Sequence, residues 1–319
     1  MKPISAALLA CGLLSALLQG SALPTLHGEA TNQEPRAAQK PEDAGQRALF
    51  SKVDAYVRCL NSLSPEIHHS RTRYFIWAAR SGPTGAERNI DGVVAIDNPS
   101  DCREAVGTVN DVTPHDPELE ATASAYVAAI TKLHPLLREA GSYEHDKSYK
   151  DDNMAKGRAL HPPLQAAFDE FFAADQKLRD LVDPVIDDHA RQDLTALENR
   201  DGRTLRFEVN ALMVDARALV SAIRTAPDTD RITAALSQYE TALAAVTALD
   251  EAAHNNDVTG VDQVVLNDAK SLGSNAKFFL RRLRDKIPYT GSEQVLLNTP
   301  DGRGGLYGQG LSCQPGKGL

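Results

Sequence analysis

The sequence has few aromatic residues and more acidic than basic ones. Phe, Trp and Tyr make up 5% of the 319 residues, and the formal net charge is −9. Strands favour aromatic and β-branched residues, so this composition disfavours a β-sandwich. A nucleic-acid surface needs a basic stripe, and the sequence contains none. Hydrophobic residues still make up 42% of the chain, so we expect a core of packed helices and no nucleic-acid binding.

Common motifs of hydrolytic and nucleotide-binding enzymes are also missing. The chain contains neither a Gly-x-Ser-x-Gly turn nor a His-Glu-x-x-His helix. The glycines of residues 302–305 lack a predicted strand before them and a predicted helix after them, so they form no phosphate-binding loop. We therefore predict that the protein is not an enzyme and carries no cofactor.

The first residues have the features of an export signal. Lys2 supplies a positive charge, residues 4–18 are apolar, and the small residues at 20–22 offer a cleavage site. The apolar run is too short for a comfortable membrane span. We predict a signal peptide over residues 1–22 and a periplasmic or secreted protein.

A lipid anchor is the alternative to a soluble exported form. Residues 8–11 (LLAC) resemble the lipobox of bacterial lipoproteins, in which the cysteine becomes the lipidated first residue. In that case the protein is anchored to the envelope through Cys11. We expect contact with a membrane only if Cys11 is lipidated.

Three cysteines remain after removal of the signal peptide, namely Cys59, Cys102 and Cys313. Exported proteins meet an oxidising compartment, so these residues are disulfide candidates. Cys59 lies in a predicted helix and Cys102 in a turn-rich segment, and we expect these two to pair. The alternative is that the cysteines are free and that Cys59 is a small buried hydrophobe.

The rest of the chain divides by composition into three parts. Residues 23–45 are rich in Pro, Gln, Glu, Ala and Thr without a period, which indicates a flexible tether. Residues 46–287 carry apolar positions at three- and four-residue spacings, typical of amphipathic helices. Residues 288–319 accumulate glycine, so we expect a disordered tail. Short connectors between the helical patterns predict an all-α, antiparallel multi-helix bundle.

Two interruptions divide the helical pattern. Residues 61–65 are expected to end a first helix, and a second should run from Pro65 to about Trp77. Several β-branched residues predict a short extended segment or hairpin near residues 88–97. Further helices are expected toward Val109, across Leu119–Leu137, from Asp152 toward Leu197, and over residues 203–224, 230–251 and 261–287.

The densest polar stretch of the helical part, residues 143–163, is the candidate site. It separates two strongly apolar helical patterns and ends in one of them. We expect it to form one rim of the bundle together with the loop at 82–102 and to bind an unknown envelope protein or a small ligand. The candidate residues are Tyr143, His145, Asp146, Tyr149, Asp151, Asp152 and His161.

The alternative for this stretch is architectural. Tyr143 and Tyr149 would pack across a turn between two helices, and Asp151 or Asp152 would cap the second helix. The charged side chains would then be solvated.

A metal-dependent bundle protein, serving metal uptake or oxidoreduction, is the alternative function. Helical bundles bind two metal ions through Glu-x-x-His pairs on facing helices. Glu66 with His69 and Glu251 with His254 have this spacing. The further inward-facing glutamates of such sites are missing, so we expect no metal.

Several phrases of the sequence resemble the DUF3829 domain of the YiiG-like bacterial proteins. They are residues 56–61 (YVRCLN), 73–77 (RYFIW), 82–88 (GPTGAER) and 149–157 (YKDDNMAKG), followed by His161-Pro162. The resemblance extends from about residue 50 to 287. It implies an exported helical protein, often a lipoprotein, of a family without an assigned activity, and it implies no functional residues.

Overall fold

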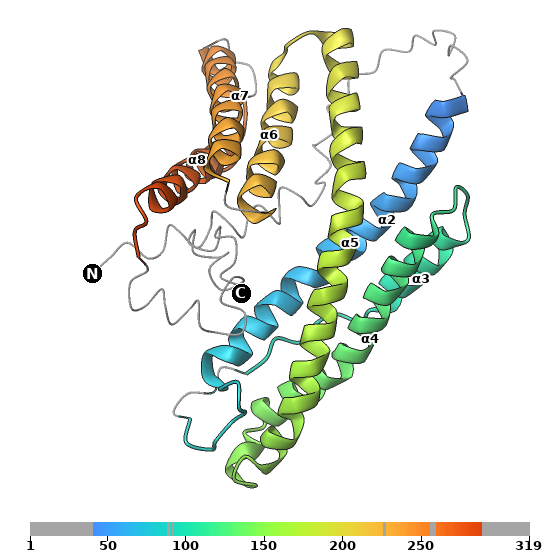
Figure 1. Ribbon diagram of the computed structural model, residues 1–319, viewed down its shortest axis with the longest axis vertical. Helices are drawn as coiled ribbons and strands as arrows, with labels where there is room; N and C mark the ends of the chain where they lie inside the picture. Colours follow the sequence, from blue (N-terminus) through green and yellow to red (C-terminus); the bar gives the residue numbers. More distant parts are fainter. Residues whose placement is uncertain (1–40, 88–89, 91, 226–227, 256–259, 289–319) are drawn as a thin grey trace. The chain divides into compact units, whose positions relative to one another are not determined.

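A computed structural model describes residues 41–87, 90, 92–225, 228–255 and 260–288; most of these residues are helical and none of them forms a β-strand (Figure 1). This confirms the predicted all-α fold. The helices are α2 (Pro41–Trp77), α3 (Ser100–Asn110), α4 (Pro117–His145), the 3-10 helix η1 (Ser148–Lys150), α5 (Ala155–Asp201), α6 (Leu205–Thr225), α7 (Thr229–Asn255) and α8 (Gln263–Arg284).

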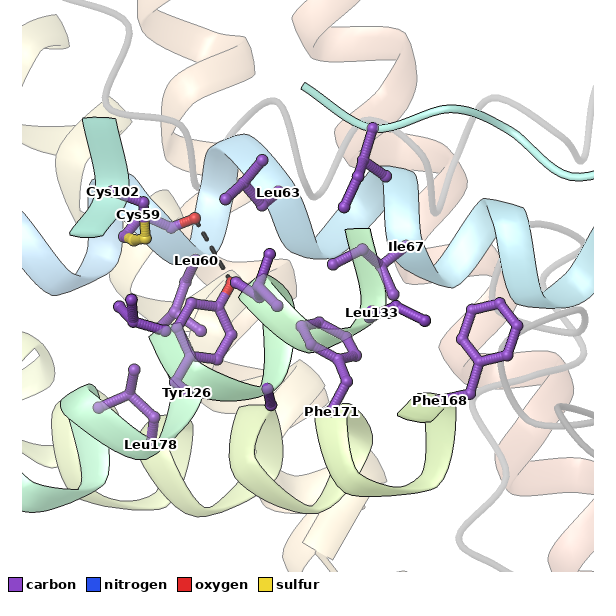
Figure 2. Packing of buried hydrophobic residues seen from close by; sticks show 14 of the residues in the cluster. Cys59, Leu60, Leu63, Ile67, Cys102, Tyr126, Leu133, Phe168, Phe171 and Leu178 are labelled. Atoms are coloured by element: carbon purple, nitrogen blue, oxygen red, sulfur yellow. Dashed lines mark hydrogen bonds between the residues drawn. A yellow bond between two sulfur atoms is a disulfide. The ribbon is translucent and has the colours of Figure 1, made fainter. Parts of the chain in front are cut away.

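The chain forms two compact units, and α5 contributes to both. In the first unit, which ends at Ile186, the apolar faces of α2, α3, α4 and the first part of α5 surround one core. Tyr126, Phe168 and Phe171 are fully buried there (Figure 2). In the second unit, which starts at Asp187, the helices α6, α7 and α8 pack around a separate core. No helix of the described residues is apolar and long enough to cross a membrane.

Helix α2 continues where the sequence predicted a break. Pro65 lies inside the helix, where it removes one backbone hydrogen bond at a cost of about 3 kcal/mol. Leu60, Leu63 and Ile67 lie on both sides of this proline and are almost fully buried. Each such side chain contributes roughly 1.5–3 kcal/mol by burial. The break predicted at residues 61–65 is therefore wrong, because continuous packing outweighs the lost hydrogen bond.

A disulfide joins Cys59 of α2 to Cys102 of α3, as the sequence predicted. Both cysteines belong to the core of the first unit. The bond attaches the short helix α3 to the long helix α2. Cys102 lies just after the connector, by which we mean residues 78–99 between these two helices, so the bond holds the end of the connector that leads into α3.

Several predictions concern the ends of the chain and the connector. Helix α2 begins at Pro41, so residues 41–45 are helical and the predicted tether ends earlier than residue 45. The described residues of the 88–97 segment are non-helical and form no strand, so they make an irregular connection and no hairpin. The signal peptide with Cys11, residues 23–40, and residues 289–319 with Cys313 lie outside the described residues.

Candidate functional site

The two segments of the predicted site contact each other, because side chains of α4 and α5 bind the backbone of the connector. Arg158 of α5 donates from Nη1 to the carbonyl of Thr84, at 3.3 Å, and from Nη2 to the carbonyl of Asn153, at 2.9 Å. One guanidinium thus joins the connector to the α4–α5 turn, by which we mean residues 146–154. The two segments lie about seventy positions apart in the sequence and form one surface.

His161 holds the beginning of the connector. Its ring is 4% exposed, its Nε2 lies 3.0 Å from the carbonyl oxygen of Arg80, and its Nδ1 lies 2.8 Å from the hydroxyl of Tyr74. A carbonyl only accepts hydrogen bonds, so Nε2 carries a proton, and in the neutral ring Nδ1 accepts from Tyr74. Gly82, at φ +100°, passes close to the ring, and a Cβ there would lie 3.3 Å from it. His161 is therefore enclosed and holds the fold.

Tyr143 and Asp152 make the architectural contacts that the alternative interpretation describes. Tyr143 is buried and donates its hydroxyl proton to Asp152 Oδ1 at 2.8 Å, while the amide of Lys156 donates to Oδ2 at 2.9 Å. The amide of Lys156 and the Tyr143 hydroxyl lower the pKa of Asp152. Burial, followed by the Asp152 carboxylate, raises the pKa of Tyr143 to about 12. Asp152 therefore caps α5 as a carboxylate.

The other predicted site residues separate into two groups. His145, at the end of α4, and Asp146 and Asp151, in the turn, are exposed. Tyr149 is half-buried, with its ring 6.4 Å from that of Tyr143 in an edge-on arrangement. Only Tyr149 of the seven candidates lines the pocket described next.

A polar pocket of about 290 Å³ lies between the connector and the α4–α5 turn. Its lining residues are Gly85, Glu87, Ile90, Tyr149, Lys150, Asn153 and Met154. Sequence reasoning placed the segments but missed most of these residues. Most of them lie in two of the phrases that resemble the family, residues 82–88 and 149–157, and this shared position could have indicated them.

The carboxylate of Glu87 is held in place by its own loop. Its Oε1 accepts the backbone amide of Thr84 at 2.5 Å and the hydroxyl of Thr84 at 2.8 Å, and its Oε2 accepts the amide of Gly85 at 2.8 Å. Burial alone would raise the pKa of Glu87, but these hydrogen bonds lower it below its usual value. Glu87 is therefore a fixed negative charge of the pocket.

The turn opposite Glu87 has unusual backbone geometry. Lys147, Asn153 and Met154 all have a positive φ, of 55°, 50° and 63°. A left-handed conformation is costly for a side chain as large as that of methionine. Met154 is nevertheless 3% exposed and packs against Gly157, where a Cβ would lie 2.5 Å from its sulfur. The surrounding packing therefore imposes the turn geometry that places Asn153 and Met154 in the pocket wall.

Glu144 holds the far end of the connector. Its Oε2 accepts the amide of Val93 at 2.6 Å, and Gly92, at φ +74°, passes so close that a Cβ would lie 2.9 Å from this oxygen. Burial raises the pKa of Glu144 to about 7, against the opposing effects of the Val93 amide and the positive charge of Arg73.

The residues of the alternative metal site are engaged in other contacts or exposed. Glu66 Oε2 accepts the amide of Asp97 at 3.4 Å, and His69 is exposed. In the second unit, His254 bonds the carbonyl of Asp250 in its own helix, and Glu251 is exposed. Nowhere in the described ranges do three or more His, Cys, Asp or Glu side chains gather as metal ligands.

A buried polar network in the core of the first unit was not predicted. Asp175 is 4% exposed and accepts hydrogen bonds from Ser64 at 2.5 Å and from Arg179 at 2.8 Å. Ser64 also contacts the hydroxyl of Tyr126 at 2.9 Å, and His68 lies 3.9 Å from Asp175. Burial opposes ionisation, but His68 and Arg179 hold the pKa of Asp175 well below its usual range. The network therefore joins α2, α4 and α5 through buried hydrogen bonds of Ser64, Tyr126 and Asp175.

Comparisons with known proteins gave two matches. A family model described as "Protein of unknown function (DUF3829)" matches residues 47–306. The chain is also 28% identical, over 266 residues, to the uncharacterized protein YiiG of Escherichia coli (strain K12). The aligned region covers 80% of this chain and 74% of that protein. No solved structure matches the chain.

Proposed function

The chain belongs to the DUF3829 family of proteins of unknown function, and on that premise we propose that it is an exported, non-catalytic binding protein of the cell envelope. The observation that carries this proposal is the pocket between the connector and the α4–α5 turn. Two segments distant in sequence are fixed against each other there by side chains of rigid helices. Loops positioned by a rigid scaffold are the usual place for binding residues.

The pocket favours binding over chemistry. Among the described residues, the side chains of Glu87, Tyr149 and Lys150 form no hydrogen bond or ion pair with one another, so the pocket holds no nucleophile that is hydrogen-bonded to a base. Two of its side chains are available to a ligand: within the described residues, Lys150 has no ion-pair partner and the Tyr149 hydroxyl has no hydrogen-bond partner. Lys150 is exposed to solvent, and a few polar groups without protein partners around a hollow are typical of a binding site.

The proposed location in the envelope rests on the first residues and on the disulfide. Bonds such as Cys59–Cys102 form and persist in oxidising compartments. A periplasmic or secreted protein fits both features, and the alternative form is anchored through Cys11.

Photo-crosslinking in living cells tests the binding role. A benzophenone amino acid replaces Tyr149 in the pocket or, as the control, Lys177, which is exposed on α5 of the same unit. We expect an adduct of defined mass at position 149 that is absent at position 177 and is lost when Lys150→Ala is added. Equal adducts at both positions, or none at 149, would refute the proposal. Asp152 is unsuitable for this test because its loss uncaps α5.

A further inference from the structure

Two opposite charges line the pocket without pairing with each other. Glu87 lies on the connector side and Lys150 lies on the turn side. In the described residues, Lys150 has no carboxylate within ion-pair distance, and Glu87 is bonded only to its own loop. A charge that lines a pocket and lacks a partner favours a ligand that carries the opposite charge.

Single-charged ligands satisfy only half of this arrangement. An anion at Lys150 meets the repulsion of Glu87, and a cation at Glu87 meets the repulsion of Lys150. A ligand with one charge of each sign satisfies both side chains and leaves the net charge of the site unchanged. The separated charges of the pocket thus complement a zwitterion.

The remaining lining sets the size and polarity of such a ligand. The volume of about 290 Å³ lies just below the usual range for drug-sized ligands and suits a smaller molecule. The Tyr149 hydroxyl and the Asn153 amide offer hydrogen bonds, while Ile90 and Met154 add an apolar surface. A molecule with a short apolar side chain between two charged ends matches this lining.

We propose that the pocket binds a small zwitterion of the α-amino acid or dipeptide class, with the ligand carboxylate on Lys150 and the ligand ammonium on Glu87. This assignment rests on the proposed binding function and adds the chemical class of ligand. Thr84 and Gly85 fix the Glu87 carboxylate before binding. Binding therefore does not have to order this group.

Three matched probes test the assignment. They are L-alanyl-L-alanine, its N-acetyl derivative, which lacks the positive charge, and its C-terminal amide, which lacks the negative charge. Each is titrated into the 15N-labelled full chain purified from the periplasm, and the backbone amide signals of Gly85 and Asn153 are followed. We expect the zwitterion to shift both signals and to bind about tenfold more tightly than either derivative.

Variants identify which side chain binds the ligand carboxylate and which binds the ligand ammonium. In Lys150→Met, the zwitterion and the C-terminal amide should bind with equal affinity, because the partner of the carboxylate is gone. In Glu87→Gln, the zwitterion and the N-acetyl derivative should bind equally, and circular dichroism checks that the loop change leaves the helices intact. Lys177→Met, on the exposed part of α5, should behave as the unchanged protein.

The outcomes distinguish this inference from the proposed function. Equal binding of all three probes at the pocket would overturn the zwitterion assignment and support a binding site of another chemistry. If no probe shifts the two amide signals at millimolar concentration, the assignment is also overturned, while a specific adduct at position 149 would still support the binding role. Absence of both the shifts and the adduct would refute both.

Discussion

Gly157 offers a sharp test of how the pocket wall is packed. A glycine inside a helix normally costs about 0.5–1 kcal/mol relative to alanine, so Gly→Ala in a helix is expected to stabilise. At Gly157, however, a Cβ would lie 2.5 Å from the sulfur of Met154 and 3.2 Å from a ring carbon of Tyr143. Both neighbours are buried, and Met154 is already held in a left-handed conformation. Overpacking of this kind costs about 1–3 kcal/mol.

The overpacking cost exceeds the gain in helix propensity. We therefore expect Gly157→Ala to lower the free energy of unfolding of the first unit by about 1–2 kcal/mol and its Tm by roughly 3–6 °C. Gly107 in α3 is the matched control, because it is exposed and no atom lies within 4 Å of a Cβ placed there. Gly107→Ala should raise the same free energy by up to about 1 kcal/mol.

Fluorescence of Trp77 is the appropriate assay. Trp77 is the single tryptophan of the chain and lies in the first unit, so its signal in urea follows the unit that holds both glycines. Parallel stabilisation by both substitutions would refute the proposed packing of Met154 against Gly157. It would also remove the reason for the strained turn in the pocket wall.

Three further predictions use the same assay. Removing the disulfide by Cys59→Ser with Cys102→Ser should lower the free energy of unfolding by about 4 kcal/mol, from its sequence separation of 43 residues; an unchanged urea midpoint would contradict this. The raised pKa of Glu144, about 7 against a usual 4.5, means that stability falls as the pH rises from about 4.5 to about 7. Glu144→Gln should therefore match the unchanged protein at pH 4.5 and exceed it by about 3 kcal/mol at pH 8, and parallel pH profiles would refute the shift. Asp175→Ala should cost about 3 kcal/mol, because it leaves Arg179 without its buried carboxylate; a loss below about 1 kcal/mol would refute that role.

The helices of this protein could be predicted because their signal is local. The apolar stripe of α4, with Leu119, Tyr126 and Leu133, recurs every three or four residues, and all three residues are buried. The break before Pro65 was predicted wrongly because the cost of a proline is also local, whereas its compensation comes from packing against distant helices. Periodicity carries no information about that compensation.

In the candidate site, too, local features could be predicted from the sequence and distant contacts could not. The sequence located the polar stretch at 143–163 and its partner loop, since turn residues and polar clusters are visible in order along the chain. It offered Asp151 or Asp152 as a cap of the second helix, but it did not show that Asp152 also bonds Tyr143, nor that His161 is enclosed by Tyr74 and the connector. The partner of His161 lies 87 positions away, and no spacing rule relates the two.

Three side chains of α4 and α5 hold the connector, whose described residues form neither a helix nor a strand. His161 binds the carbonyl of Arg80, Arg158 binds the carbonyl of Thr84, and Glu144 binds the amide of Val93. Backbone groups of an irregular segment need partners, and here helix side chains supply them. These contacts fix the connector at Arg80, Thr84 and Val93 before any ligand arrives, so the entropy cost of ordering these positions is met on folding and not on binding. A shallow polar pocket can then bind a small charged molecule with few contacts.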